Sequence, residues 1–139
     1  MNAPRLVGET KSQGWEIGVR RTLPISAGKA WRLLLEALGL AGIEEPDAPV
    51  DKKGLTFKTE AGTEVEIRSY EPSNLLRMKW QPRGWDVNST LQIRVAPAKT
   101  GSTLSVHHEW LQNAEQREAM RAYWTALLDE LRMRVGASE

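Results

Sequence analysis

The sequence predicts an α+β fold in which a six-stranded, curved antiparallel sheet wraps around one long C-terminal helix. Three observations support this prediction. Short segments in which apolar and polar residues alternate recur along the chain, with turn residues between them, as in a sheet with one buried face. A short amphipathic segment follows the first of them, and a long helical pattern ends the chain. An apolar sheet face needs a cover, and the final helix is long enough to supply it.

The first half of the chain predicts a strand, a short helix and a loop. The strand covers residues 15–21, where apolar residues alternate with polar ones. Ser26 then suits a helix N-cap, and apolar residues recur at helical spacing up to Gly39, which favours a helix end. We expect residues 40–54, with two prolines, to form a long solvated loop. Its acidic residues lack the spacing of a calcium loop; they are Glu44, Glu45, Asp47 and Asp51.

Five more strands are predicted between turns rich in glycine, proline and asparagine, at residues 55–59, 63–70, 75–81, 89–96 and 103–110. In the last of these strands, alternation places His108 on the inner face of the sheet and His107 on the outer face. The same alternation predicts that Trp110 faces inward. An inward imidazole suits either ligand orientation or a core histidine bonded to the backbone or to a tryptophan, and both interpretations stay open.

The final helix is predicted over residues 114–135. Asn113 is a suitable cap, and Gln116 stands at the reciprocal position of a capping box. The helix carries a continuous apolar stripe, made of Met120, Tyr123, Trp124, Leu127, Leu128, Leu131 and Val135. A helix of this length spans roughly 33 Å at about 1.5 Å per residue, enough to cross a sheet.

Composition limits the class of protein. The 139 residues fit one domain at residues 15–136, after a flexible tail at residues 1–14. The net charge of +1 includes no concentrated basic patch, so we expect no nucleic-acid partner. The absence of cysteine excludes disulfides and cysteine-ligated metals. We see neither a signal peptide nor an apolar run of membrane length, and therefore expect a cytoplasmic protein without a membrane span.

Four segments resemble a known family. They are PISAGKAWRLL at residues 24–34, LLRMKWQPRGW at residues 75–85, and LSVHHEWL with REAMRAYWTALLDEL within residues 104–131. The chain resembles the START-like (SRPBCC, helix-grip) superfamily and, within it, the branch named after the activator of heat-shock protein 90 ATPase. The likeness covers about residues 15–135. It implies the helix-grip fold, and the superfamily it points to includes ligand carriers, cyclases, oxygenase subunits and co-chaperone domains.

A curved sheet and a single helix rarely fill the space between them, so we expect a cavity that binds a small hydrophobic ligand without catalysis. A filled core is the alternative. The residues expected to line the cavity are Trp31, Leu34, Met78, Trp80, His108, Trp110, Met120, Trp124 and Leu127. Two other functions stay open: a protein-interaction module related to chaperone ATPase activators, and a polyketide-cyclase-like enzyme using His108. We assign no catalytic residue, metal or cofactor, and expect a monomer or weak homodimer.

Overall fold

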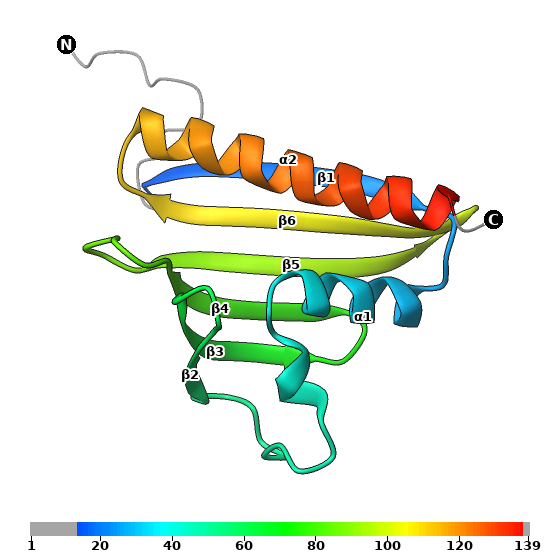
Figure 1. Ribbon diagram of the computed structural model, residues 1–139, viewed down its shortest axis with the longest axis horizontal. Helices are drawn as coiled ribbons and strands as arrows, with labels where there is room; N and C mark the ends of the chain where they lie inside the picture. Colours follow the sequence, from blue (N-terminus) through cyan, green and yellow to red (C-terminus); the bar gives the residue numbers. More distant parts are fainter. Residues whose placement is uncertain (1–13, 138–139) are drawn as a thin grey trace.

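The computed structural model describes residues 14–137, so the predicted tail lies outside the described residues apart from Gly14. The elements follow the predicted order (Figure 1): β1 (Trp15–Leu23), α1 (Ala27–Ala37), the 3-10 helix η1 (Ala41–Glu44), β2 (Thr56–Lys58), β3 (Glu64–Glu71), β4 (Leu75–Gln81), β5 (Ser89–Ala98), β6 (Gly101–Leu111) and α2 (Ala114–Ala137). The α+β prediction is confirmed. Within residues 40–54, expected to be a loop throughout, the structure places the short helix η1.

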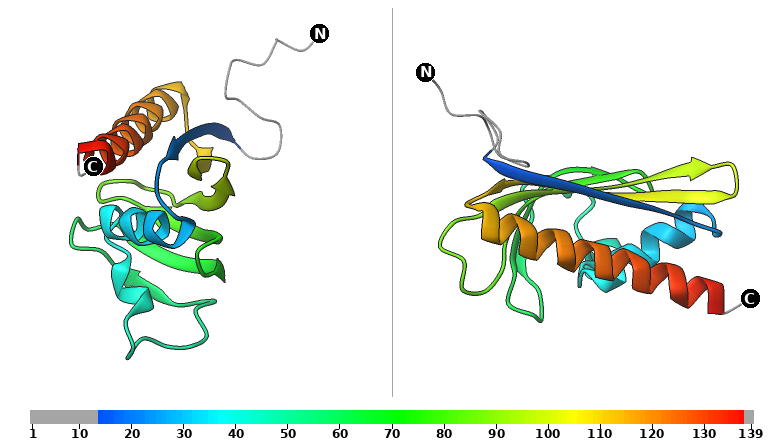
Figure 2. Two further views of the ribbon diagram at one scale, coloured as in Figure 1. Left: turned by 90° about the vertical axis from the view of Figure 1, so that its right-hand side faces the viewer. Right: turned by 90° about the horizontal axis from the view of Figure 1, so that it is seen from above.

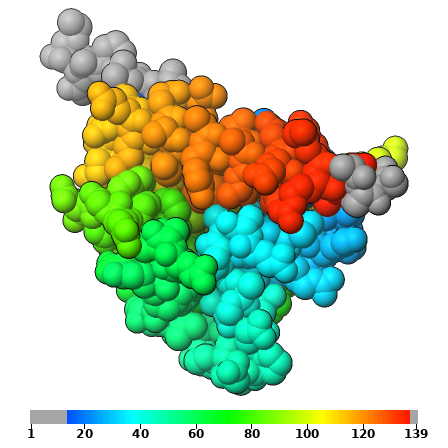
Figure 3. Space-filling model, viewed as in Figure 1, coloured from blue at the N-terminus to red at the C-terminus, as the bar shows by residue number. Residues whose placement is uncertain are grey.

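The sheet has the strand order β1-β6-β5-β4-β3-β2, with every neighbouring pair antiparallel. Both long helices lie on the same face of this sheet. Helix α2 runs along β1 and β6, and α1 packs against β5 and β6 (Figures 1 and 2). In the space-filling view, α1 in cyan and α2 in orange and red lie side by side over the sheet (Figure 3). None of the helices within residues 14–137 is long and apolar enough to cross a membrane.

The two ends of α1 are defined by local hydrogen bonds. The Ser26 side chain caps the N-terminus, as predicted. At the other end Gly39 adopts a φ of +73°, a conformation that glycine tolerates best. Its N–H donates to the Glu36 carbonyl at 3.1 Å, and the Leu40 N–H donates to the Leu35 carbonyl at 2.8 Å. This Schellman arrangement stops the helix and directs the chain into η1.

Helix α2 is held by its apolar stripe and by an ion pair. Arg21 of β1 donates to Asp129 of α2 at 2.8 Å. Asn113 accepts from the Gln116 N–H at 2.8 Å, which confirms the predicted cap. The stripe is narrower than predicted, because Tyr123 is 47% exposed and Met120 and Leu127 are only partly buried. Its fully buried members are Trp124, Leu128, Leu131 and Val135.

The prediction that Trp110 faces inward is wrong. Ile17 pairs with His108 while Trp15 pairs with Leu111, so β6 holds one residue more than β1 at this point. This β-bulge shifts the alternation of side chains between the two faces. Trp110 takes a φ of +63° and is 44% exposed, and Leu111 occupies the buried position instead. Simple alternation could not anticipate the extra residue.

Candidate functional site

An aromatic cluster gathers around His108 at the end of the sheet where β6 leads into α2. The His108 ring stacks on Trp85, with centroids 6.1 Å apart and planes within 8°. Trp80 meets the same ring edge-on at 5.1 Å, and Trp124 does so at 5.9 Å. Tyr123 contacts Trp124 at 4.7 Å. The cluster therefore joins β4, β6, α2 and the β4–β5 connection into one packed unit.

A chain of hydrogen bonds runs through this cluster. Trp124 Nε1–H donates to His108 Nδ1 at 3.0 Å, and His108 Nε2 lies 2.7 Å from Ser89 Oγ. The Ser89 hydroxyl donates to the Trp80 carbonyl at 2.6 Å. An indole nitrogen only donates, so His108 Nδ1 is the acceptor and Nε2 carries the proton. These contacts require a neutral imidazole.

The environment of His108 favours that neutral form. The side chain is fully buried, and burial, with a smaller effect of His107, lowers the pKa of His108 to about 3. Both ring nitrogens are already hydrogen-bonded, so the residue has no proton or lone pair to offer a ligand. The structure thus matches the core-histidine interpretation, with a tryptophan as one of its partners.

Beside the cluster lies a hollow of about 650 Å³, called the Trp80 hollow below. It lies between the end of α1, η1, the β2–β3 turn and α2. Tyr123, which is 47% exposed, supplies aromatic surface, while Trp80 and Leu38 also line the hollow but are only 6% and 9% exposed. The polar side chains that line it are Glu36, Thr59, Glu60 and Thr63.

A second hollow, of about 350 Å³, continues between α1 and α2 and is called the interhelical groove. It shares Ala37 and Tyr123 with the Trp80 hollow, so the two meet at these residues. Leu127 and Leu131 provide its apolar lining, with Glu130 and Arg134 also at its wall. The exposed Tyr123 ring thus stands at the junction of two concave surfaces.

The nine residues predicted to line a cavity separate into distinct groups. Trp80 lines the Trp80 hollow, and Leu127 lines the interhelical groove. Met120 packs against the core and is partly buried, while Trp110 lies in the exposed bulge. The remaining five are no more than 1% exposed and belong to the core; they are Trp31, Leu34, Met78, His108 and Trp124. Most of the predicted lining therefore packs closely.

Glu44 has a role that the sequence did not reveal. It was expected in a solvated acidic loop, yet its carboxylate accepts from Trp31 Nε1 at 2.9 Å and from the Tyr70 hydroxyl. Burial and the nearby Glu44 carboxylate raise the pKa of Tyr70. These bonds tie η1 to α1 and β3, and so hold one border of the Trp80 hollow. The available signal was Trp31, since a buried indole needs an acceptor.

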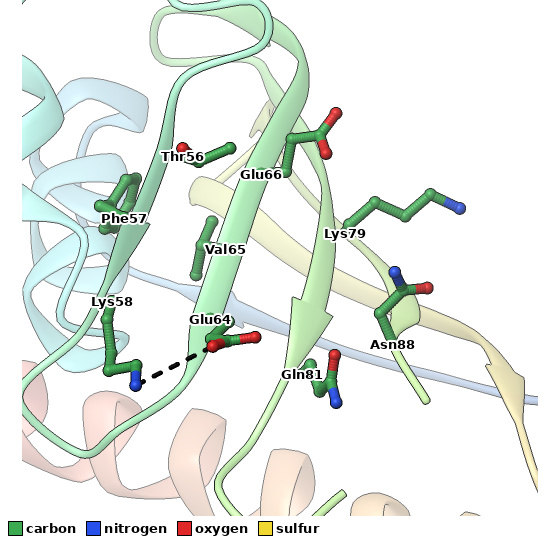
Figure 4. A pocket seen from close by; sticks show the side chains of 9 residues that line it. All are labelled: Thr56, Phe57, Lys58, Glu64, Val65, Glu66, Lys79, Gln81 and Asn88. Carbon is green, nitrogen blue, oxygen red and sulfur yellow. Dashed lines mark ion pairs between the residues drawn. The ribbon is translucent and has the colours of Figure 1, made fainter. Parts of the chain in front are cut away.

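A further hollow, of about 350 Å³, lies over β2, β3 and β4 and is called the outer hollow (Figure 4). Glu64 and Glu66 line it, and they alternate with the buried Val65, so they face away from the helices. Lys58 pairs with Glu64 at 3.9 Å, and Lys79 lines the same surface. Balanced charges of this kind are typical of a solvated sheet face. Within residues 14–137 no three acidic or histidine side chains form a possible metal site.

Comparison with known proteins identifies relatives of this chain. The model of the family described as "Activator of Hsp90 ATPase homolog 1-like protein" matches residues 27–136. Comparison with curated protein sequences found no match. Several solved structures have the same fold at low sequence identity.

DynU16, a protein of the dynemicin biosynthetic locus, is similar with a TM-score of 0.71 and 15% identity, over 89% of this chain and 48% of DynU16. This chain thus spans about half the length of DynU16. An HSP90 activator from Plasmodium falciparum gives a TM-score of 0.69 and 15% identity, over 88% of this chain and 97% of the activator. The Aha1 dimer from Colwellia psychrerythraea gives a TM-score of 0.61 and 14% identity, over 84% of this chain and 92% of the Colwellia chain. At such identities the similarity concerns the fold.

Proposed function

This chain belongs to the family of activator of Hsp90 ATPase homolog 1-like proteins, as its resemblance predicted, and we propose that it binds a small hydrophobic molecule without transforming it. The binding site in this proposal is the Trp80 hollow, with the interhelical groove as its extension. The sequence suggested a site deeper between sheet and helix. The proposal places the ligand instead at the end of α1, where concave surface is available.

The observation that carries the proposal is the size and lining of the Trp80 hollow. Its volume of about 650 Å³ falls within the range of roughly 300–1,000 Å³ common for small-molecule sites. Aromatic surface from Tyr123, which is 47% exposed, suits a flat apolar ligand, and the nearly buried Trp80 adds a small area. Trp80 is held by its neighbours in the His108 cluster, so this part of the wall is formed before a ligand arrives.

Catalysis is left out of the proposal because of His108. A general acid or base needs a reachable nitrogen and a pKa near the working pH. His108 has both nitrogens hydrogen-bonded, no exposed surface and a pKa lowered to about 3. The proposal further assigns the protein to the cytoplasm as a monomer or weak homodimer.

The test uses N-phenyl-1-naphthylamine, a neutral probe whose fluorescence rises in apolar surroundings. We expect saturable binding to the purified protein. Tyr123→Ala should weaken that binding about fivefold, because an aromatic contact contributes about 1 kcal/mol. Tyr123 is 47% exposed, so the substitution should leave the fold intact.

Val87→Ala is the matched control, since Val87 is similarly exposed at 49% and is not among the residues that line the Trp80 hollow. Equal affinity in wild type and Tyr123→Ala would refute the assignment of the site. A folded protein that binds no neutral probe would refute ligand binding itself and favour the protein-interaction alternative. Native mass spectrometry of freshly purified protein would show whether a small molecule co-purifies.

A further inference from the structure

We infer that the ligand of the Trp80 hollow is a hydrophobic cation, in which a protonated amine or quaternary ammonium group is attached to an apolar body. This inference rests on the proposed function and adds the charge of the ligand. Three independent features of the hollow favour positive charge: its carboxylates, the end of α1 and its aromatic rings.

The charged side chains that line the hollow are carboxylates from two separate elements. Glu36 lies in the last turn of α1, and Glu60 lies in the β2–β3 turn. Within residues 14–137, the lining of this hollow includes no Lys, Arg or His. The Arg83 side chain packs against Gly62, which belongs to the same turn as Glu60, but Arg83 is not among the residues that line the hollow. The formal charge of the lining is therefore −2, from Glu36 and Glu60.

The end of α1 adds negative potential. Residues Glu36, Ala37, Leu38 and Gly39 all line the hollow, so the C-terminus of the helix lies at its wall. A helix C-terminus is equivalent to roughly half a negative charge and stabilises cations. The last turn of α1 contains no basic residue to neutralise it. An ammonium group in the hollow would therefore be favoured by backbone as well as side chains.

The aromatic rings provide the third feature. A cation close to the face of an indole or phenol ring is attracted by about 0.5–2 kcal/mol. Tyr123, which is 47% exposed, brings a phenol ring to the hollow, and Trp80 also lines it but is only 6% exposed. Thr59 and Thr63 also line the hollow and carry no charge. Ring surface beside carboxylates is the combination that an amphiphilic cation requires.

The interhelical groove and the outer hollow lack this bias. In the interhelical groove Glu130 is offset by Arg134. In the outer hollow two lysines offset two glutamates (Figure 4). The Trp80 hollow thus differs from both in charge, and a cation should select it over them.

The test compares three probes that share one naphthalene body: 1-naphthylmethylammonium, 1-naphthylmethanol and 1-naphthoate. Affinities are measured by isothermal titration calorimetry near neutral pH, at low and high salt. We expect the cation to bind about tenfold tighter than the neutral alcohol, since about 1.4 kcal/mol corresponds to tenfold. The anion should bind more weakly than the alcohol, and salt should reduce these differences.

Two variants locate the effect. Glu36→Gln and Glu60→Gln remove one charge each from exposed side chains, and each should weaken cation binding about threefold with little change for the alcohol. Glu64→Gln is the matched control, because it removes a carboxylate from the outer hollow. It should leave all three affinities unchanged.

The outcomes distinguish the cation inference from the proposal that the protein binds a small hydrophobic molecule. Equal binding of cation and alcohol, or tighter binding of the anion, would overturn the cation inference and leave hydrophobic binding standing. An effect of Glu64→Gln as large as that of Glu36→Gln would also overturn it. Failure of all three probes to bind a folded protein would overturn both.

Discussion

Acid sensitivity is the sharpest consequence of the buried His108. Its pKa is about 3 in the folded protein and about 6.5 in an unfolded chain. The unfolded state therefore takes up the proton first as pH falls. The stability associated with the neutral imidazole is complete above about pH 6.5 and is lost progressively as pH drops towards about 3.

The magnitude follows from the separation of the two pKa values. Each unit by which the pH falls below the unfolded pKa of about 6.5 lowers the free energy of unfolding by about 1.4 kcal/mol. Between about pH 7 and pH 5, above the range where most carboxylates titrate, the loss is about 2 kcal/mol. Urea melts at closely spaced pH values in this window measure it directly.

Two variants assign the effect to one residue. His108→Gln keeps a donor and an acceptor for Ser89 and Trp124 but cannot be protonated, so its free energy of unfolding should vary about 2 kcal/mol less over the window. His107→Gln removes the chain's other histidine, which is partly exposed, and should keep most of the pH dependence. The reasoning would be refuted if the free energy of unfolding of His108→Gln fell with pH as steeply as that of the wild type. It would also be refuted if the free energy of unfolding of His107→Gln did not change with pH.

Three further predictions concern packing and the backbone. Leu128→Ala should lower the free energy of unfolding by about 2–5 kcal/mol, because Leu128 is fully buried. Leu127 is only partly buried, so Leu127→Ala should lower it by less than about 2 kcal/mol. Equal losses for the two variants in urea melts would contradict the orientation of α2. Gly101→Ala should cost more than about 4 kcal/mol or prevent folding, since an added Cβ would lie 2.0 Å from the Leu23 carbonyl oxygen. A Cβ added at Gly28 would meet open space, so Gly28→Ala should stabilise α1 by about 0.5–1 kcal/mol in thermal melts. A lower stability in this variant would contradict the placement of Gly28.

Much of the fold was predictable because its signals are local. The limits of β4 at Leu75–Gln81 agree with the predicted strand, since alternation there is unbroken. The caps Ser26 and Asn113 were predictable because a helix start requires a side-chain acceptor. Family membership was recognisable from segments that include Ser26 and the whole of β4.

The misplaced residues each reflect a non-local contact. Trp110 depends on the pairing of β6 with β1, where one extra residue shifts the faces. Glu44 depends on Trp31 and Tyr70, which come from two other elements. Tyr123 has the periodicity of a core residue but lies beside the gap between α1 and α2. A single sequence reports periodicity, but neither the strand pairing that can shift it nor what covers each face.

The site was hardest to predict because periodicity selects the residues that pack best. Interiors are filled to nearly crystalline density, and strongly inward residues such as Met78 and Trp124 become core. Trp80 is shared, since it contacts His108 and also lines the hollow. His108 should therefore affect a ligand only indirectly, through Trp80 and through the contact of Trp124 with Tyr123, so His108→Gln should weaken probe binding less than Tyr123→Ala does. A larger loss in His108→Gln would mean that the imidazole meets the ligand directly, and that the cluster opens in solution.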